Sequence, residues 1–112
     1  MLDEFKTAME VATRRNDARN FRIGCVIRRR DGVLVMSANG PCNNKMPSAH
    51  AEARCSKKAT PGSIAYVVRV LKNGKLALAK PCIPCQIRLR SVGVTRVFFS
   101  IEEGVFDSLT IN

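Results

Sequence analysis

The chain lacks tryptophan, and its 112 residues include one tyrosine and one histidine. With aromatic residues at 5%, it has too few rings to predict a base-stacking platform for long single-stranded nucleic acid. It also has no apolar run near the roughly 20 residues that a membrane-spanning helix needs. Its first residues carry neither the basic nor the apolar part of a secretion signal. We therefore expect an intracellular, cytoplasmic protein.

Acidic side chains are missing from residues 53–101, a stretch that contains ten lysines and arginines. The whole chain has 19 basic and nine acidic residues, which gives a net charge of +10. This charge predicts attraction to polyanions, although a solvated basic surface that serves only solubility has the same composition. The five cysteines are an odd number without a visible secretion signal, which favours thiols or metal ligands over disulfides.

Length and composition predict one globular domain over residues 1–112. Hydrophobic spacing and turn residues predict a series of elements. The first half of the chain is predicted to form a helix over 2–15, strands over 23–30 and 33–38 around an Asp31-Gly32 turn, a loop over 39–48 and a helix over 49–59. A strand over 64–71 and a short strand or extended segment over 76–78 follow. The remainder is predicted to form a helix from Pro81 to Val92, a strand over 94–100 and a short helical or coil tail after Glu102. This order predicts an α/β fold, a single three-layer domain whose mixed five-stranded sheet has helices on both faces.

Two of the predicted helices begin with residues that can bind a metal. His50 and Glu52 open the first, and Cys82 and Cys85 open the second, where a spacing of three places both sulfur atoms on one face. A Cys/His metal site in this chain must use His50, the only histidine. One nitrogen and two sulfur ligands with a fourth position open is the composition of a catalytic zinc site. A carboxylate such as Glu52 beside an activated water can then move protons as a general acid and base.

The segments His50-Ala51-Glu52 and Pro81-Cys82-Ile83-Pro84-Cys85 resemble the H-x-E and P-C-x-x-C signature of the zinc-dependent cytidine and deoxycytidylate deaminase superfamily. The resemblance covers residues 20–100. It implies one Zn2+ per chain held by His50, Cys82 and Cys85, with Glu52 as the catalytic proton shuttle. It further implies that Asn39 and the backbone N–H of Ala51 contact the substrate, although Asn39 alone is also a common turn residue.

The chain departs from the family pattern in ways that leave the subfamily open. The His-Ala-Glu form is similar to the branch that contains deoxycytidylate deaminases, tRNA adenosine deaminases and polynucleotide cytidine deaminases. Lys80 matches none of the residues expected before Pro81, no tryptophan precedes that motif, and no second histidine is present for an additional zinc site.

Several residues keep a second interpretation. Cys42 is close enough in sequence to His50 to complete a structural four-ligand zinc site, but a loop or core thiol is the simpler interpretation. Cys25 and Cys55 are expected to be small core residues. Residues 28–30, three consecutive arginines, either contact phosphates or are solvated at the tip of the hairpin.

The resemblance implies an enzyme, a zinc-dependent hydrolytic deaminase that converts cytosine to uracil in a nucleoside or nucleotide and releases ammonia. Cytidine, deoxycytidine and dCMP are the expected substrates, and the expected assembly is a homo-oligomer. The first alternative is a deaminase that acts on single-stranded DNA or RNA, on cytosine or on tRNA adenine, which the +10 charge favours. The second is a noncatalytic structural-zinc module that binds nucleic acid.

Overall fold

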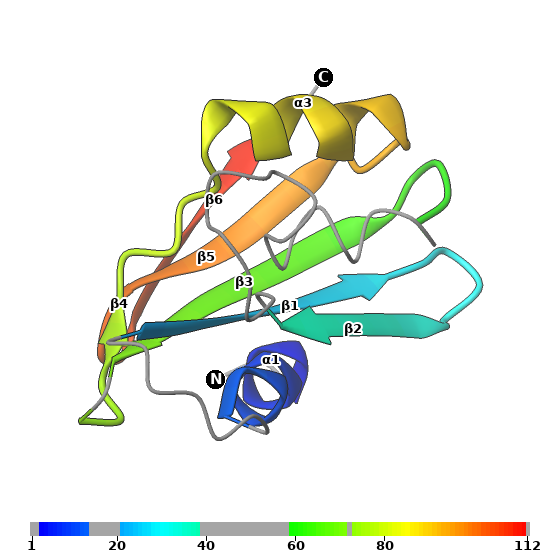
Figure 1. The fold of residues 1–112 in the computed structure, drawn as a ribbon. Coiled ribbons are helices and arrows are strands. Elements are labelled where there is room, and N and C mark those ends of the chain that lie inside the picture. The colour runs from blue at the N-terminus through cyan, green and yellow to red at the C-terminus, as the bar shows by residue number, and fades with distance from the viewer. Residues whose placement is uncertain (1–2, 14–20, 39–58, 72, 112) are drawn as a thin grey trace.

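The structure is a computed structural model, and it describes residues 3–13, 21–38, 59–71 and 73–111. Its elements, in chain order, are α1 (Asp3–Thr13), β1 (Phe21–Arg28), β2 (Leu34–Ala38), β3 (Ile64–Leu71), β4 (Leu76–Ala77), α3 (Ile83–Ser91), β5 (Arg96–Glu102) and β6 (Val105–Thr110). Figure 1 shows α1 on one side of the sheet and α3 on the other, which confirms the predicted α/β fold with helices on both faces.

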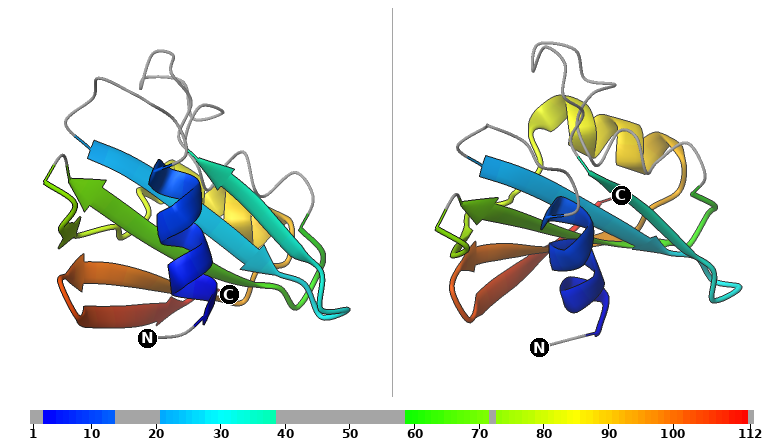
Figure 2. Two further views of the ribbon diagram at one scale, coloured as in Figure 1. Left: turned by 90° about the horizontal axis from the view of Figure 1, so that it is seen from below. Right: turned by 60° about the horizontal axis from the view of Figure 1, so that its bottom comes forward.

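The strands form one mixed sheet of six strands, with the order β2-β1-β3-β5-β6 and with β4 paired to β3. The strands β3 and β5 are parallel, as expected for strands joined through a helix, and the other pairs are antiparallel. The two views in Figure 2 show α1 lying across the sheet. The predicted number of five strands was wrong, because the chain after Glu102 adds a further strand.

The C-terminal residues form β6 and not the predicted helical or coil tail. A turn at residues 103–104, where Gly104 has φ of +77°, reverses the chain so that β6 pairs antiparallel with β5. Strand β6 lies at the edge of the sheet and its side chains range from partly buried to exposed, so it tolerates Asp107 and Ser108. The acidic residues in this region therefore lie in and beside an edge hairpin.

The hairpin of β1 and β2 forms around the predicted turn. The N–H of Gly32 donates to the carbonyl of Arg29 at 3.0 Å, and the N–H of Arg29 donates to the carbonyl of Val33 at 2.9 Å. Gly32 has φ of +87°, a conformation that glycine adopts without steric cost. Residues 29 and 30 belong to this turn, so β1 ends two residues earlier than the sequence predicts.

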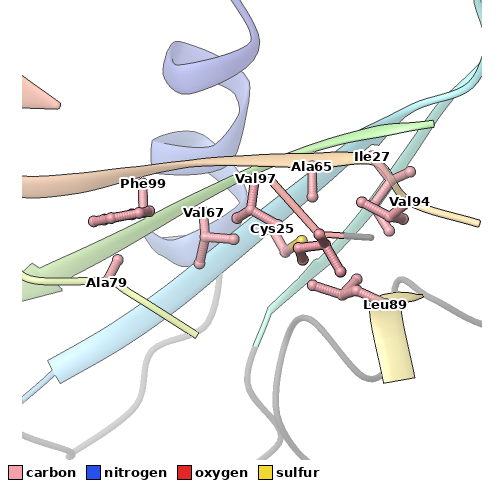
Figure 3. Packing of buried hydrophobic residues seen from close by; sticks show 10 residues of the cluster. Cys25, Ile27, Ala65, Val67, Ala79, Leu89, Val94, Val97 and Phe99 are labelled. Carbon is pink, nitrogen blue, oxygen red and sulfur yellow. The ribbon is translucent and has the colours of Figure 1, made fainter. Parts of the chain in front are cut away.

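Side chains that alternate along β1 and β3 divide the core between the two faces of the sheet. On the α1 face, buried Phe5, Ala8 and Ala12 pack against Val26 and Tyr66. On the α3 face, the cluster shown in Figure 3 consists of Cys25, Ile27, Ala65, Val67, Ala79, Leu89, Val94, Val97, Phe99 and Ile111. Cys25 is completely buried there, which confirms its prediction as a core residue.

Helix α1 lies very close to β1 because residue 24 is a glycine. A Cβ atom added at Gly24 would come within 2.0 Å of the carbonyl oxygen of Ala8 and 3.0 Å of the Cβ of Ala12. The small residues on both elements therefore allow the two backbones to touch, and this contact sets the position of α1 on the sheet.

Candidate active site

The two cysteines of the sequence motif lie at the start of α3. Cys82 is the N-cap residue, with extended dihedral angles of φ −68° and ψ 165°, and Pro84 occupies the first turn. Proline is compatible with that turn because the first N–H groups of a helix have no partner within the helix. Cys85 is buried with 1% of its surface exposed, whereas Cys82 is exposed. The helix therefore presents one sulfur atom from inside the molecule and one from its surface, both near its N-terminal end.

The start of α3 is held to the preceding chain by Gln86. Its side-chain Nε2 donates to the carbonyl of Pro81 at 2.9 Å, and its backbone N–H donates to the carbonyl of Cys82 at 2.9 Å. These bonds fix the chain direction at the point where residue 82 enters the helix. Gln86 is thus a positioning residue for the cysteine pair, and no feature of its sequence position predicted this role.

The segment that leads to the cysteines is fixed to the sheet by Ser100, a completely buried residue of β5. Its hydroxyl donates to the carbonyl of Ala77 at 2.7 Å, and its carbonyl accepts the N–H of Ala79 at 2.8 Å. At the start of β4, the N–H of Leu76 donates to Glu103 Oε2 at 2.9 Å. The approach to Cys82 therefore has a defined path along the edge of β5.

The charges along α3 suit a site for metal-bound sulfur at its N-terminal end. No acidic residue occupies the first turn, and Arg88 and Arg90 lie in the last turn. The positive end of the helix dipole therefore faces the cysteines without a competing carboxylate from this turn, and the arginines complement its negative end. A cationic metal with two anionic sulfur ligands is compatible with this arrangement.

The structure places Cys82 and Cys85 at the N-terminal end of the same helix, α3. His50, Ala51, Glu52 and Asn39 lie outside the described residues, as do Cys42 and Cys55. Within the described ranges no cluster of three metal-ligating side chains is present. These cysteines supply two of the three protein ligands that are expected for zinc, and both lie at the start of α3.

Tyr66 is a titratable group with a clear change in pKa, and it lies on the α1 face of the sheet. Burial raises the pKa of Tyr66 above its ordinary value of 10.0, the nearby charge of Arg28 lowers it, and a hydrogen bond with Glu4 raises it further. Its ring stacks on Phe98 with centroids 5.3 Å apart and meets Phe5 edge to face at 5.6 Å. These contacts belong to the core under α1, on the side of the sheet away from the cysteines.

Comparison with known proteins identifies the family. Residues 3–101 match the profile of the cytidine and deoxycytidylate deaminase zinc-binding region, so this chain belongs to that family. No curated protein sequence matches the chain significantly.

Three solved structures with a similar fold are cytidine deaminases. The enzyme from Mycobacterium leprae is 19% identical, with a TM-score of 0.63 over 95% of this chain and 90% of that one. The enzyme from Mycobacterium tuberculosis is 16% identical, with a TM-score of 0.58 over 90% and 86% of the two chains. A mutant of the same enzyme is 17% identical, with a TM-score of 0.61 over 90% and 87%. These matches establish the cytidine deaminase fold of the chain.

Neither helix in the described part of the chain is long and apolar enough to cross a membrane.

Proposed function

We propose that this chain is a zinc-dependent hydrolytic deaminase that converts cytosine to uracil in a nucleoside or nucleotide, with cytidine, deoxycytidine or dCMP as substrate. The observation that carries this proposal is the pair Cys82 and Cys85 at the start of α3, within a chain that matches the zinc-binding deaminase family over residues 3–101. The similar solved structures, whose names identify them as cytidine deaminases, support a cytosine substrate.

His50, Cys82 and Cys85 would hold one Zn2+, and Asn39 and the Ala51 N–H would orient the substrate. When bound, zinc supplies Lewis-acid activation of a water molecule. Glu52 would accept a proton from the attacking water and deliver it to the ring nitrogen of the base. It would then transfer the second proton of that water to the amino group, which leaves as ammonia while the oxygen becomes the carbonyl of uracil. The products are the uracil compound and ammonia, so water is the only co-reactant.

The deciding experiment is mass spectrometry of the products from the zinc-loaded protein with six substrates: cytidine, deoxycytidine, their two monophosphates, a single-stranded oligonucleotide and tRNA. We expect turnover of at least one free nucleoside or nucleotide. Glu52→Ala should keep its zinc and fold but lose orders of magnitude in turnover, because the proton shuttle is removed. Near-normal turnover in that variant would exclude Glu52 from the mechanism.

The net charge of +10 favours a second candidate, a deaminase of single-stranded DNA or RNA that acts on cytosine or on tRNA adenine. Efficient conversion of the oligonucleotide or of tRNA, together with no conversion of free nucleosides and nucleotides, would put this candidate first. Zinc binding without turnover of any of the six substrates would instead support a structural-zinc module.

A further inference from the structure

An open pocket lies beside the turn that joins β1 and β2. Its volume is about 370 Å³, and it is lined by Arg28, Arg29, Arg30, Gly32, Gly62 and Ile64. We call it the arginine pocket. Among the described residues that line it, three of six are cationic and none is acidic. A concave site of this kind is suited to an anion.

The arginine pocket lies at the opposite end of α3 from the cysteines. The N–H of Gly62, in the pocket wall, donates to the carbonyl of Gly93 at 2.8 Å, just after the last residue of α3. Figure 1 shows the β1–β2 turn and the end of α3 on the same side of the molecule. The nine residues of α3 separate this end from Cys82 by about 13 Å at 1.5 Å per residue. The arginine pocket is therefore a separate site from the one at Cys82.

Arg30 supplies the pocket with a cation that the described fold does not neutralise. Its side chain is exposed, and among the described residues ion pairs are formed by Arg28 and Arg29 but not by Arg30. The stem of Arg30 lies against Gly62, where an added Cβ would come within 2.3 Å of Arg30 Cδ. The absence of a side chain at Gly62 therefore leaves the space that this arginine occupies.

Arg29 is held in place and keeps donors that the turn does not use. Its Nη2 pairs with Asp31 Oδ2 at 2.8 Å, and Asp31 Oδ1 accepts the N–H of Val33 at 3.1 Å. Arg29 Nε is buried and has no hydrogen-bond acceptor among the described residues. A guanidinium group has five N–H donors, so the pair with Asp31 leaves capacity for a second anion.

One further arginine, Arg96, extends the basic surface from Arg28 across the sheet. Arg28 of β1 and Arg96 of β5 are both in register with Ile64 of β3, so all three share one row. Arg28 lies 5.9 Å from the centre of the Tyr66 ring, and Arg96 lies 5.8 Å from the centre of the Phe98 ring. The aromatic row beneath them thus supports both guanidinium groups by cation–π contact.

The acidic groups near this surface do not cancel it. Glu4 lies 3.6 Å from Arg28, whose side chain is 46% exposed, and such an exposed pair holds an arginine weakly. Asp31 pairs with Arg29. In the part of the chain that the structure describes, four arginines therefore face two carboxylates. Arg28 and Arg96 lie two strands apart, a separation of about 10 Å. One phosphate group does not span that length, whereas successive phosphates of a chain do.

We propose that the arginine pocket, together with Arg96 beside it, binds the phosphodiester backbone of a nucleic acid. The contacts are to phosphate and not to bases, because no aromatic side chain whose burial the structure describes is exposed beside the arginines to stack a base. Binding at this site does not depend on deamination, so it stands or falls independently of the proposed function.

The test measures binding of a fluorescein-labelled single-stranded 20-nucleotide DNA to the zinc-loaded full chain by anisotropy, across a series of salt concentrations. Arg30→Gln should weaken binding about 5-fold and should reduce the slope of log affinity against log salt by about 0.7, the value expected when one phosphate is no longer neutralised. The loss should be the same for oligo-dT and oligo-dC. Arg96→Gln should act in the same direction.

Lys75→Gln is the matched control, because Lys75 is an exposed cation in the turn between β3 and β4, at the other end of the sheet. It should change affinity for the DNA less than 2-fold.

Equal effects of Arg30→Gln and Lys75→Gln on DNA affinity would overturn the proposal, because they would indicate that binding depends only on the diffuse net charge. Absence of DNA binding by the unmodified protein at low salt would also overturn it. The proposal would likewise be overturned if dCMP displaced the DNA when the concentration of dCMP equals the concentration of nucleotides in the DNA. Turnover of a free nucleoside should be unchanged in Arg30→Gln.

Discussion

Cys85 has a double role at the residue scale, because it is both a buried side chain of α3 and a predicted zinc ligand. Replacement by serine keeps the size of the side chain but removes the soft sulfur donor that zinc prefers. We predict that Cys85→Ser loses most of its bound zinc, as measured by atomic emission spectroscopy of the purified protein.

Cys25→Ala provides the control, since Cys25 is completely buried in the core of the same sheet face. It should keep one zinc per chain and lose about 1 kcal/mol of stability from the smaller side chain. Full zinc content in Cys85→Ser would remove Cys85 from the ligand set.

Tyr66 makes stability depend on alkaline pH. Because its pKa in the folded protein lies above the ordinary value of 10.0, the folded chain keeps a proton that the unfolded chain loses above that pH. The free energy of unfolding should therefore fall as pH rises above about 10. Tyr66→Phe should show a smaller fall, measured as urea midpoints between about pH 9 and 11. Other groups that titrate in this range are common to the unmodified protein and Tyr66→Phe. Equal pH dependence of stability in these two proteins would contradict the prediction.

At the scale of elements, the position of the cysteine pair depends on how α3 is joined to the chain before it. The amide of Gln86 bonds to the carbonyl of Pro81, next to Cys82. Gln86→Ala should therefore weaken zinc affinity by about 10-fold, as is typical of residues that orient metal ligands. Competition with a chelator measures the change.

Ser91→Ala is a matched control on the same helix, because the hydroxyl of Ser91 bonds to the carbonyl of Arg88 at the end away from the cysteines. It should leave zinc affinity unchanged. A similar loss in both variants would mean that general weakening of α3, and not the orientation of Cys82, controls affinity.

The elements that the sequence predicts well are those whose signals are local. The spacing of Phe5 and Ala12 places both on the buried face of α1, and glycine in the Asp31-Gly32 turn produces the β1–β2 hairpin. Strand β6 was missed because its acidic and polar residues are typical of a solvated tail. The Glu103-Gly104 pair that precedes it was the available turn signal.

The candidate site also has a part that the sequence predicts and a part that it does not. The motif predicts Cys82 and Cys85 at a helix start because that information lies within a few residues. The support from Ser100 could not be predicted, since its bond to Ala77 joins residues 23 positions apart and requires the pairing of the sheet. The expected roles of His50 and Glu52 remain predictions, because they lie outside the described residues.

At the scale of the whole molecule, we predict that the protein is a homo-oligomer. A chain of 112 residues has little surface for enclosing a pocket by itself, and the family that it resembles often completes its sites with a neighbouring subunit. Ile83 and Ile87, one turn apart on α3, are 64% and 56% exposed, which is unusual for large apolar residues. Sedimentation velocity of the zinc-loaded protein should therefore show a species larger than the monomer.

Ile87→Glu should shift that species toward the monomer, because a charge on this face of α3 disfavours its burial. Val105→Glu is the control, since Val105 is also exposed, at 41%, but lies at the β5–β6 hairpin. A fully active monomer of the unmodified protein at assay concentration would contradict the prediction.

The aromatic cluster under α1 gives the molecule a built-in spectroscopic probe. Because the sequence has no tryptophan and one tyrosine, nearly all its intrinsic emission arises from Tyr66, whose ring stacks on Phe98 beneath the helix. Emission intensity thus reports whether α1 is docked on its face of the sheet, while the cysteines belong to the opposite face. Undocking of α1 can therefore be followed by tyrosine emission without a label, while zinc content is measured separately on the same samples.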